Sequence, residues 1–295
     1  DDSPVTFGNW SPKNYENDYV GKITYRYALQ HSRNVAAVKI ADEVGMTKVI
    51  KLAKEMGIST LTDQDYNLST ALGGLTHGVT PLDMVQAYGV LANGGIKVQP
   101  TAILKIVDRN GQVVEENSIQ EKRVVDEKDA AIITNMLESV INGGTGGNAA
   151  IGRPAAGKTG TTDDSKDAWF VGYTPDLVAA VWIGDDYGSE TLHGITGGDT
   201  PAIMWGQFMA NALANTPASD FSVPSSAQSA ISEGYYNPVK AQPKKDDKKD
   251  EKADKKDDKD KSKDEAVKDD SGSKDDATEQ KSNSSKSKKS SKKDR

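Results

Sequence analysis

Two short segments of the sequence carry the residue types used in acyl-transfer chemistry. The first is the run K-T-G-T-T at residues 158–162, where one lysine stands among small residues. On a strand, lysine and threonine side chains can fix a carboxylate, and the glycine lets an extended peptide backbone approach closely. The second is the run S-R-N at residues 32–34. A serine hydroxyl can relay a proton, and an asparagine amide can hold a substrate carbonyl.

Each segment also has a simpler interpretation. A Lys-Thr-Gly tripeptide arises by chance in many proteins, and Ser and Asn commonly end one helix and cap the next. Taken singly, neither run predicts a site. The histidines His31, His77 and His193 lack ligand spacing, so neither a metal site nor a Ser-His-Asp triad is predicted, and no cofactor is expected.

Capping residues and glycine stops predict the helices that would position these runs. Thr24 is expected to cap a helix that leads into S-R-N, and Thr47 a helix that stops at Gly57. Thr80 is followed by proline at the first helical position and an aspartate three residues on, a clear helix start. Asp126 is expected to cap a further helix ahead of K-T-G.

Other local signals in the sequence predict strands. The dipeptide at 110–111, Asn-Gly, lies between two β-rich runs and predicts a hairpin. After K-T-G, strand-like runs at 167–173 and 176–186 are joined by a turn at 174–176. We expect K-T-G on a strand at the rim of the sheet, where an extended peptide can pair with its main chain. Helices and antiparallel strands in one core predict an α+β fold.

Composition divides the chain in two. Residues 241–295 hold 19 of the 37 Lys and Arg residues and 16 of the 44 acidic residues, with no aromatic residue. Such a segment buries too little apolar area to offset the entropy lost on ordering. We therefore expect a globular portion over residues 1–235 and a disordered Lys-, Asp- and Ser-rich tail over 236–295. Its mixed charge argues against nucleic-acid binding, and a solvated linker is a simpler interpretation than contact with anionic wall polymers.

The sequence also lacks features that several classes of protein require. The chain has no cysteine, which excludes disulfides and thiolate metal sites. No stretch of the sequence approaches the ~20 apolar residues that a membrane span needs. The first residues lack an initiator Met and read as a loop from the middle of a protein, so we expect the chain to be a fragment.

Together the two runs resemble the serine acylases of the penicillin-binding and β-lactamase superfamily, which use S-x-x-K, S-x-N and K-T-G in that order. HSRNVAAVKIADEVG looks like the S-x-N segment, and AAGKTGTTDDSKDAWFVGYTPDLVAAVWIG looks like the K-T-G strand with the two strands after it. TALGGLTHGVTPLDMVQAYGVLANGG and MLESVINGGTGGNAA are similar to linking segments of class A, bifunctional penicillin-binding proteins. The resemblance covers about residues 5–215 and implies the C-terminal part of a transpeptidase domain, with a partial β-lactamase/transpeptidase-like fold.

The resemblance also implies residue roles. Ser32 would join the proton relay to the leaving amine, and Asn34 would hold the amide of the donor peptide. Lys158 would supply positive potential near the donor carboxylate, and the Thr161 N–H would form half of an oxyanion hole. The implied catalytic residues are Ser32, Asn34, Lys158, Thr159 and Gly160, and the implied substrate-binding residues are Thr161, Thr162 and Trp169.

The nucleophile that the family requires is missing. Family order places S-x-x-K upstream of Ser32, yet no serine in residues 1–240 precedes a lysine by three positions. Matches after residue 240, such as Ser271 with Lys274, follow K-T-G and arise from a Ser- and Lys-rich composition. The fragment alone is therefore expected to be inactive, although the complete protein would be a serine-type D-Ala-D-Ala transpeptidase.

The resemblance implies peptidoglycan stem peptides and β-lactams as ligands. It implies an upstream remainder that holds a glycosyltransferase domain and the membrane anchor, at the outer face of the cytoplasmic membrane or in the cell wall. The Lys- and Ser-rich tail fits a Gram-positive bacterium best. An alternative stays open: a non-catalytic module of this fold that senses or scaffolds cell-wall components. A secreted β-lactamase fits poorly because of the long charged tail.

Overall fold

A three-stranded antiparallel sheet positions the K-T-G run. Its strands are β5 (Ala156–Thr161), β6 (Asp167–Tyr173) and β7 (Val178–Gly184), in the order β5-β6-β7. K-T-G therefore lies on an edge strand, as predicted. The computed structural model describes residues 1–232, and the tail predicted over 236–295 lies outside these residues.

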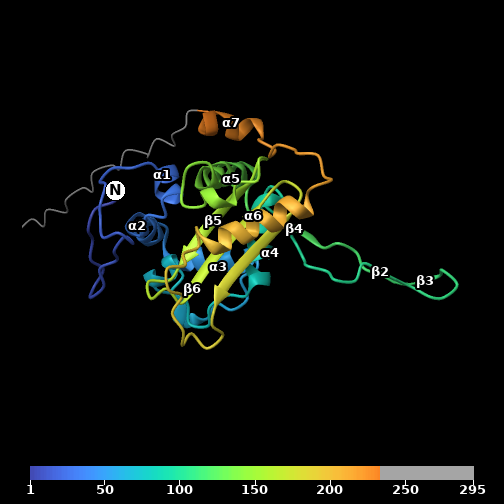
Figure 1. Cartoon of the computed structure of the whole chain (residues 1–295), viewed down its shortest axis with the longest axis horizontal. Helices are drawn as coiled ribbons and strands as arrows, with labels where there is room; N and C mark the ends of the chain where they lie inside the picture. Colours follow the sequence, from blue (N-terminus) through green and yellow to red (C-terminus); the bar gives the residue numbers. More distant parts are fainter. Residues whose placement is uncertain (233–295) are drawn as a thin grey trace, which may run out of the picture. The chain divides into compact units, whose positions relative to one another are not determined.

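Helices surround this sheet in Figure 1. Helices and 3₁₀ turns of the described residues are α1 (Tyr25–Gln30), α2 (Asn34–Val44), α3 (Met46–Met56), η1 (Asp63–Asp65), η2 (Leu68–Leu72), α4 (Pro81–Ala92), α5 (Glu127–Ile141), η3 (Gly147–Ala149), α6 (Thr200–Ala212) and α7 (Ser225–Ser232). None of the helices within residues 1–232 is both long enough and apolar enough to cross a membrane.

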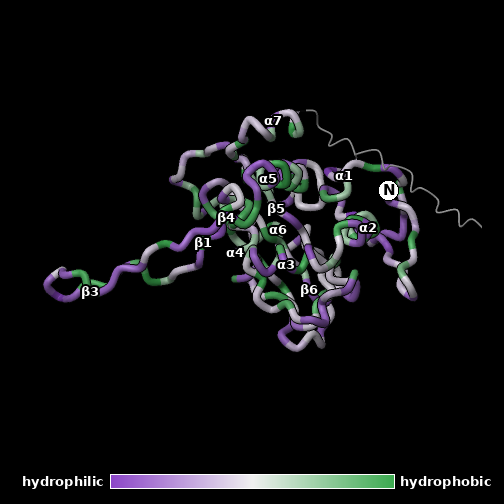
Figure 2. The backbone as a smooth tube through the Cα atoms, turned by 180° about the vertical axis from the view of Figure 1, so that it is seen from behind, coloured by the Kyte–Doolittle hydropathy of each residue, from purple (hydrophilic) through white to green (hydrophobic). Residues whose placement is uncertain are grey.

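Two small antiparallel pairs lie outside the main sheet. They are β1 (Ile96–Val98) with β4 (Glu121–Arg123), and β2 (Lys105–Val107) with β3 (Val113–Glu116). The β2–β3 ribbon extends away from the sheet in Figures 1 and 2. It turns at the predicted Asn-Gly dipeptide, where Gly111 has a φ of 79° and its N–H donates to the Asp108 carbonyl. The predicted hairpin is confirmed.

Three predicted helix starts are confirmed by their caps. The side chain of Thr24 accepts from the N–H of Tyr27, and that of Thr80 accepts from the N–H of the third residue of α4. The side chain of Asp126 accepts from the N–H of the second residue of α5. The prediction for Thr47 is wrong. Gly45, with a φ of 90°, ends α2 and begins α3, so the helix starts ahead of Thr47, which lies inside its first turn.

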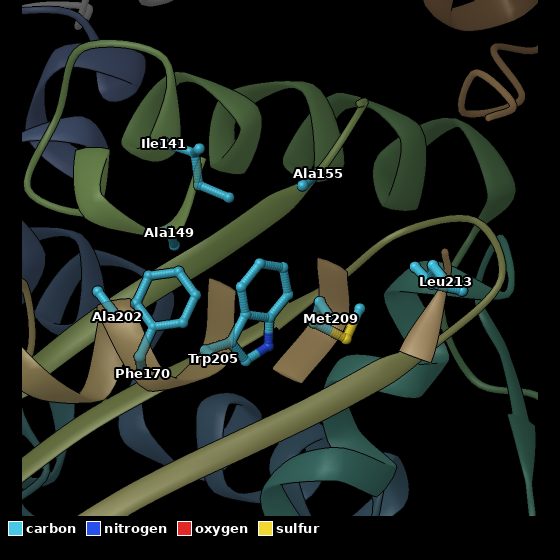
Figure 3. Packing of buried hydrophobic residues seen from close by; sticks show 8 residues of the cluster. All are labelled: Ile141, Ala149, Ala155, Phe170, Ala202, Trp205, Met209 and Leu213. Carbon is cyan, nitrogen blue, oxygen red and sulfur yellow. The ribbon is translucent and has the colours of Figure 1, made fainter. Parts of the chain in front are cut away.

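Both faces of the sheet are buried by helices, which explains the nearly continuous apolar sequence of β6. On one face the ring centroids of Phe170 and Trp205 lie 5.1 Å apart, between β6 and α6 (Figure 3). The indole N–H of Trp205 donates to the Ala179 carbonyl of β7 at 3.1 Å. On the other face Tyr173 packs with α4 and α5, and its hydroxyl bonds to Thr134 at 2.9 Å. Helices and antiparallel strands thus share one core, as an α+β fold requires.

Candidate active site

The two runs singled out in the sequence meet in the structure. The Lys158 Nζ donates to the Ser32 Oγ at 2.7 Å and to the carbonyl of Thr159 at 2.9 Å. Ser32 lies between α1 and α2, whereas Lys158 lies on β5, so this contact joins the helical part to the edge of the sheet. Burial lowers the pKa of Lys158 from its ordinary value of 10.5 to about 8.

Ser32 occupies a backbone conformation that normally favours glycine. Its φ is 52°, and it follows the C-cap residue of α1, His31. The Arg33 N–H donates to the Ala28 carbonyl at 2.8 Å, and the Ser32 N–H donates to the Leu29 carbonyl at 3.2 Å. These bonds form a Schellman motif, in which glycine usually takes the left-handed position. A serine there costs about 1 kcal/mol or more, so the position retains a hydroxyl at the expense of backbone strain.

Asn34 begins α2 on the other side of the turn. Its Nδ2 donates to the carbonyl of Lys13 at 3.0 Å. That bond fixes the orientation of the side-chain amide and leaves its oxygen and a second N–H for a ligand.

The threonines of β5 have defined partners. The hydroxyls of Thr159 and Thr145 lie 2.8 Å apart, and the Gly197 N–H donates to the Thr161 Oγ1 at 3.0 Å. Because the Thr161 oxygen accepts this bond, its own proton is free to donate to a ligand. Sequence reasoning missed both Thr145 and Gly197, although Thr145 stands in a glycine-rich run after α5.

A close backbone approach occurs beside Gly160, and the glycine that it requires is Gly197. A Cβ added to Gly197 would lie 2.5 Å from the Gly160 carbonyl oxygen and 2.3 Å from that of Trp169. The loop that holds Gly197 therefore lies directly against β5 and β6. That Gly160 admits a substrate backbone stays a prediction, because the nearest atoms to a Cβ added to Gly160 belong to the Trp169 side chain, at 3.3 Å.

Two cavities meet at this point. A polar cavity of about 650 Å³ and an apolar cavity of about 590 Å³ share Ser32, Arg33, Asn34, Thr159 and Thr161 in their linings. Lys158 lines the apolar cavity, together with aliphatic side chains from α1, α2, η2 and α5. These aliphatic residues are Ala28, Leu29, Ala37, Ile40, Ala71, Leu72, Ile132, Ile133 and Met136.

Two residues expected to bind substrate lie apart from both cavities. The Thr162 hydroxyl oxygen accepts from the N–H groups of Lys166 and Asp167, which closes the turn between β5 and β6. The Trp169 ring lies 6.1 Å from that of Trp182. Neither Thr162 nor Trp169 lines the polar or the apolar cavity, so their substrate contact remains a prediction.

Residues 1–193 match the penicillin binding protein transpeptidase domain. The chain is 41% identical over 217 residues to penicillin-binding protein 1A of Aquifex aeolicus, covering 73% of this chain and 29% of that protein. It is 38% identical over 224 residues to penicillin-binding protein 1A of Clostridium botulinum, covering 75% of this chain and 27% of that protein. The chain thus spans less than a third of the length of these relatives.

Solved structures of penicillin-binding proteins are also similar to this chain. The crystal structure of penicillin-binding protein 1A from Haemophilus influenzae superposes with a TM-score of 0.70 at 26% identity, covering 76% of this chain and 40% of that one. The PonA1 protein from Mycobacterium tuberculosis, solved in complex with penicillin V, superposes with a TM-score of 0.67 at 30% identity, covering 75% of this chain and 65% of that one. The chain therefore belongs to the transpeptidase domain family of the class A penicillin-binding proteins and has its α+β fold.

Proposed function

We propose that this chain forms one wall of the active site of a serine-type D-Ala-D-Ala transpeptidase, which cross-links peptidoglycan stem peptides and binds β-lactams. The observation that carries the proposal is the 2.7 Å contact between Lys158 and Ser32, which joins the K-T-G and S-R-N runs. The solved PonA1 protein, which is similar to this chain, is described as a complex with penicillin V.

The nucleophilic serine and its activating lysine, in this proposal, come from a part of the complete protein outside these 295 residues. Support comes from the apolar cavity of about 590 Å³, which ends at Ser32 and Lys158. Its aliphatic lining suits the apolar side of a helix, and burying such surface contributes roughly 25 cal/mol per Å². A helix placed there would present its polar residues to Ser32 and Lys158.

The reaction begins when the incoming serine gives its hydroxyl proton to its activating lysine and attacks the carbonyl of the donor D-Ala-D-Ala bond. The tetrahedral intermediate collapses to an acyl-enzyme and expels the terminal D-Ala, whose amine takes a proton relayed through Ser32. An acceptor amine from a second strand then displaces the serine from the acyl group.

The negative oxygen of the intermediate needs N–H donors at the open edge of β5. The Thr162 N–H donates to the Asp167 carbonyl on β6 at 3.1 Å. Because successive N–H groups of a strand point to opposite sides, the Thr161 N–H faces the open edge. It supplies one donor of the oxyanion hole, and the N–H of the incoming serine supplies the other.

The donor carboxylate is held by the side chains of β5. Lys158, with a pKa of about 8, is largely protonated at neutral pH and provides a positive charge. The Thr161 hydroxyl, whose oxygen accepts from the Gly197 N–H, donates its proton to the carboxylate. In this proposal the Thr145 hydroxyl donates to that of Thr159, 2.8 Å away, so that Thr159 donates its own proton to the carboxylate. Asn34 holds the donor amide.

The remaining parts of the proposal concern the complete protein. The relatives are more than three times as long as the matched region, which leaves room for a glycosyltransferase domain and a membrane anchor. The protein would act at the outer face of the cytoplasmic membrane. The Gram-positive source rests on the Lys- and Ser-rich sequence after residue 240, and it stays a prediction because the relatives include Aquifex and Rickettsia proteins.

Covalent labelling by a fluorescent penicillin tests the proposal. The 295-residue chain is compared with a version extended to the natural upstream sequence. We expect only the extended version to be labelled. Labelling of the short chain would place a reactive serine within it and refute the assignment of the nucleophile. Absence of label from both would favour the non-catalytic binding module.

A further inference from the structure

Residues 1–21 form a closed loop that packs against the S-R-N turn, and its residues Asn14, Tyr15, Glu16 and Asp18 line the polar cavity. The Asp2 N–H donates to the Gly21 carbonyl at 2.6 Å, and the Gly21 N–H donates back to the Asp2 carbonyl at 3.0 Å. In Figure 1 this segment lies next to α1 and α2. It lies outside both the K-T-G and the S-R-N runs, yet its side chains contact the second of them.

Asp2 is the centre of this contact. Its side chain is fully buried, and its carboxylate accepts from Asn14 Nδ2 at 2.8 Å and from the Val20 N–H at 3.2 Å. The Arg33 Nε also donates to it at 2.9 Å, and a terminal nitrogen of the same guanidinium forms an ion pair with it at 2.7 Å. Burial by itself raises the pKa of Asp2, but the bonds from Asn14 and Arg33 outweigh it and hold the pKa below the usual value.

Arg33 makes two further hydrogen bonds to the same loop. Its two terminal nitrogens donate to the Asp18 carboxylate and to the Asp18 carbonyl, both at 2.8 Å. The Arg33 side chain is only 10% exposed. Arg33 is the middle residue of S-R-N, so these bonds from its guanidinium fix the backbone between Ser32 and Asn34.

Asn14 completes the arrangement by capping α2. The helix has no side-chain cap of its own, because its N-cap residue is Arg33. The Asn14 Oδ1 instead accepts from the Val35 N–H at 3.2 Å, which satisfies one of the unpaired donors at the start of the helix. The loop thus holds both the turn and the first residues of α2.

We propose that Asp2 and Arg33 are positioning residues for the transpeptidase reaction: their buried ion pair holds Ser32 in its left-handed conformation, with its hydroxyl on Lys158. If Ser32 relaxed to a negative φ, the following residue would rotate and Arg33 would leave Asp2, so that a buried carboxylate would lose its partner. Loss of one partner of a buried pair is strongly destabilising, so the strained turn is the lower-energy state. The inference rests on the proposed function.

The test uses the complete protein with three single substitutions, Asp2→Asn, Arg33→Lys and Asp1→Asn. Asp1→Asn is the matched control, since it removes the same charge one residue away, from a side chain that is 57% exposed and 3.9 Å from Lys39. Acylation by fluorescent penicillin and the melting temperature are measured for each. We expect Asp2→Asn and Arg33→Lys to slow acylation by about 10- to 100-fold, because a displacement near 1 Å has that effect. Asp1→Asn stays within about twofold of wild type.

The pKa of Lys158, measured by NMR on the folded variants, separates positioning from simple stabilisation. Displacement of Ser32 admits water to Lys158, so its pKa rises from about 8 towards 10.5 in Asp2→Asn and Arg33→Lys, but not in Asp1→Asn. The double variant loses no more activity than the worse single one, because both act through one ion pair. If Asp2→Asn does not fold, the inference is tested on Arg33→Lys alone, because this variant keeps the positive charge.

The outcomes separate this inference from the proposed function. A wild-type protein that is not acylated refutes the proposed function. Two results would overturn the inference when the wild type is acylated. In the first, the folded Asp2→Asn and Arg33→Lys variants are acylated at the wild-type rate. In the second, the pKa of Lys158 is unchanged in both variants. Equal losses in Asp1→Asn and Asp2→Asn overturn it as well.

Discussion

The hydroxyls of Thr145 and Thr159 lie 2.8 Å apart and join the glycine-rich loop after α5 to the K-T-G strand. The Thr145 N–H also donates to the Gln30 carbonyl at 3.2 Å, at the end of α1. Thr145 therefore links the strand that holds Lys158 to the helix that leads to Ser32. This link connects three segments that line the polar cavity or lead to it.

Thr145→Val should slow acylation of the complete protein by about 5- to 20-fold, because it removes one hydrogen bond of about 1 kcal/mol and leaves the Thr159 hydroxyl without its partner. Thr145→Ser keeps the hydroxyl and is the control, with a rate close to wild type. The measurement is the second-order rate constant for penicillin. Equal rates for both variants would show that Thr145 does not orient Thr159.

Comparison of Ser32→Gly with Ser32→Ala should separate the effect of backbone strain on stability from the effect of the hydroxyl on acylation. Both remove the hydroxyl, so both lose most of the acylation rate. Glycine adopts the φ of 52° without penalty, whereas alanine keeps the strain, so Ser32→Gly should be more stable than Ser32→Ala by about 1 kcal/mol. Denaturant unfolding measures the difference. An alanine variant as stable as the glycine variant would mean that the turn is unstrained.

Lys158 gives the chain a defined pH dependence. Its pKa of about 8 in the folded state lies below its ordinary value of 10.5, so between these values the unfolded chain binds more protons. Stability relative to Lys158→Met should therefore rise with pH through this window, by about 3 kcal/mol in total. Urea unfolding at pH 7 and pH 10.5 measures it, and parallel curves for the two proteins would contradict the lowered pKa.

Gly197→Ala should displace the loop from the sheet. The added Cβ would meet the carbonyl oxygens of Trp169 at 2.3 Å and Gly160 at 2.5 Å, and neither backbone atom can move aside cheaply. We expect a loss of stability of about 2 kcal/mol or more, together with slower acylation as Thr161 loses its N–H partner. Gly89→Ala in α4 is the control, because a Cβ there meets nothing within 4 Å. Equal effects of the two substitutions would exclude a specific role for Gly197.

Much of the local structure was predictable from sequence because its signals are local. The Thr80 cap with its following proline, and the Asn-Gly dipeptide of the β2–β3 ribbon, act within a few residues of their own position. The start of α3 was misplaced because Gly45 both ends one helix and begins the next, so the capping threonine expected at Thr47 is unnecessary. The strand β4, with the sequence Glu-Lys-Arg, carries no pattern that predicts a strand.

The site itself was predictable only in part. The K-T-G and S-R-N runs were found by their residue types, but only the family resemblance placed Ser32 near Lys158. The ion pair of Asp2 with Arg33 joins residues 31 positions apart, and no period or motif marks it. Such pairings depend on how the chain packs in three dimensions, which a single sequence does not display.

The most direct test of the central claim is to locate the acylated serine. The complete protein is treated with a β-lactam, digested, and the modified peptide is identified by mass spectrometry. We predict that the acyl group lies on a serine outside these 295 residues, followed three positions later by a lysine. An acyl group on Ser32, or on any other serine of this chain, would contradict the account.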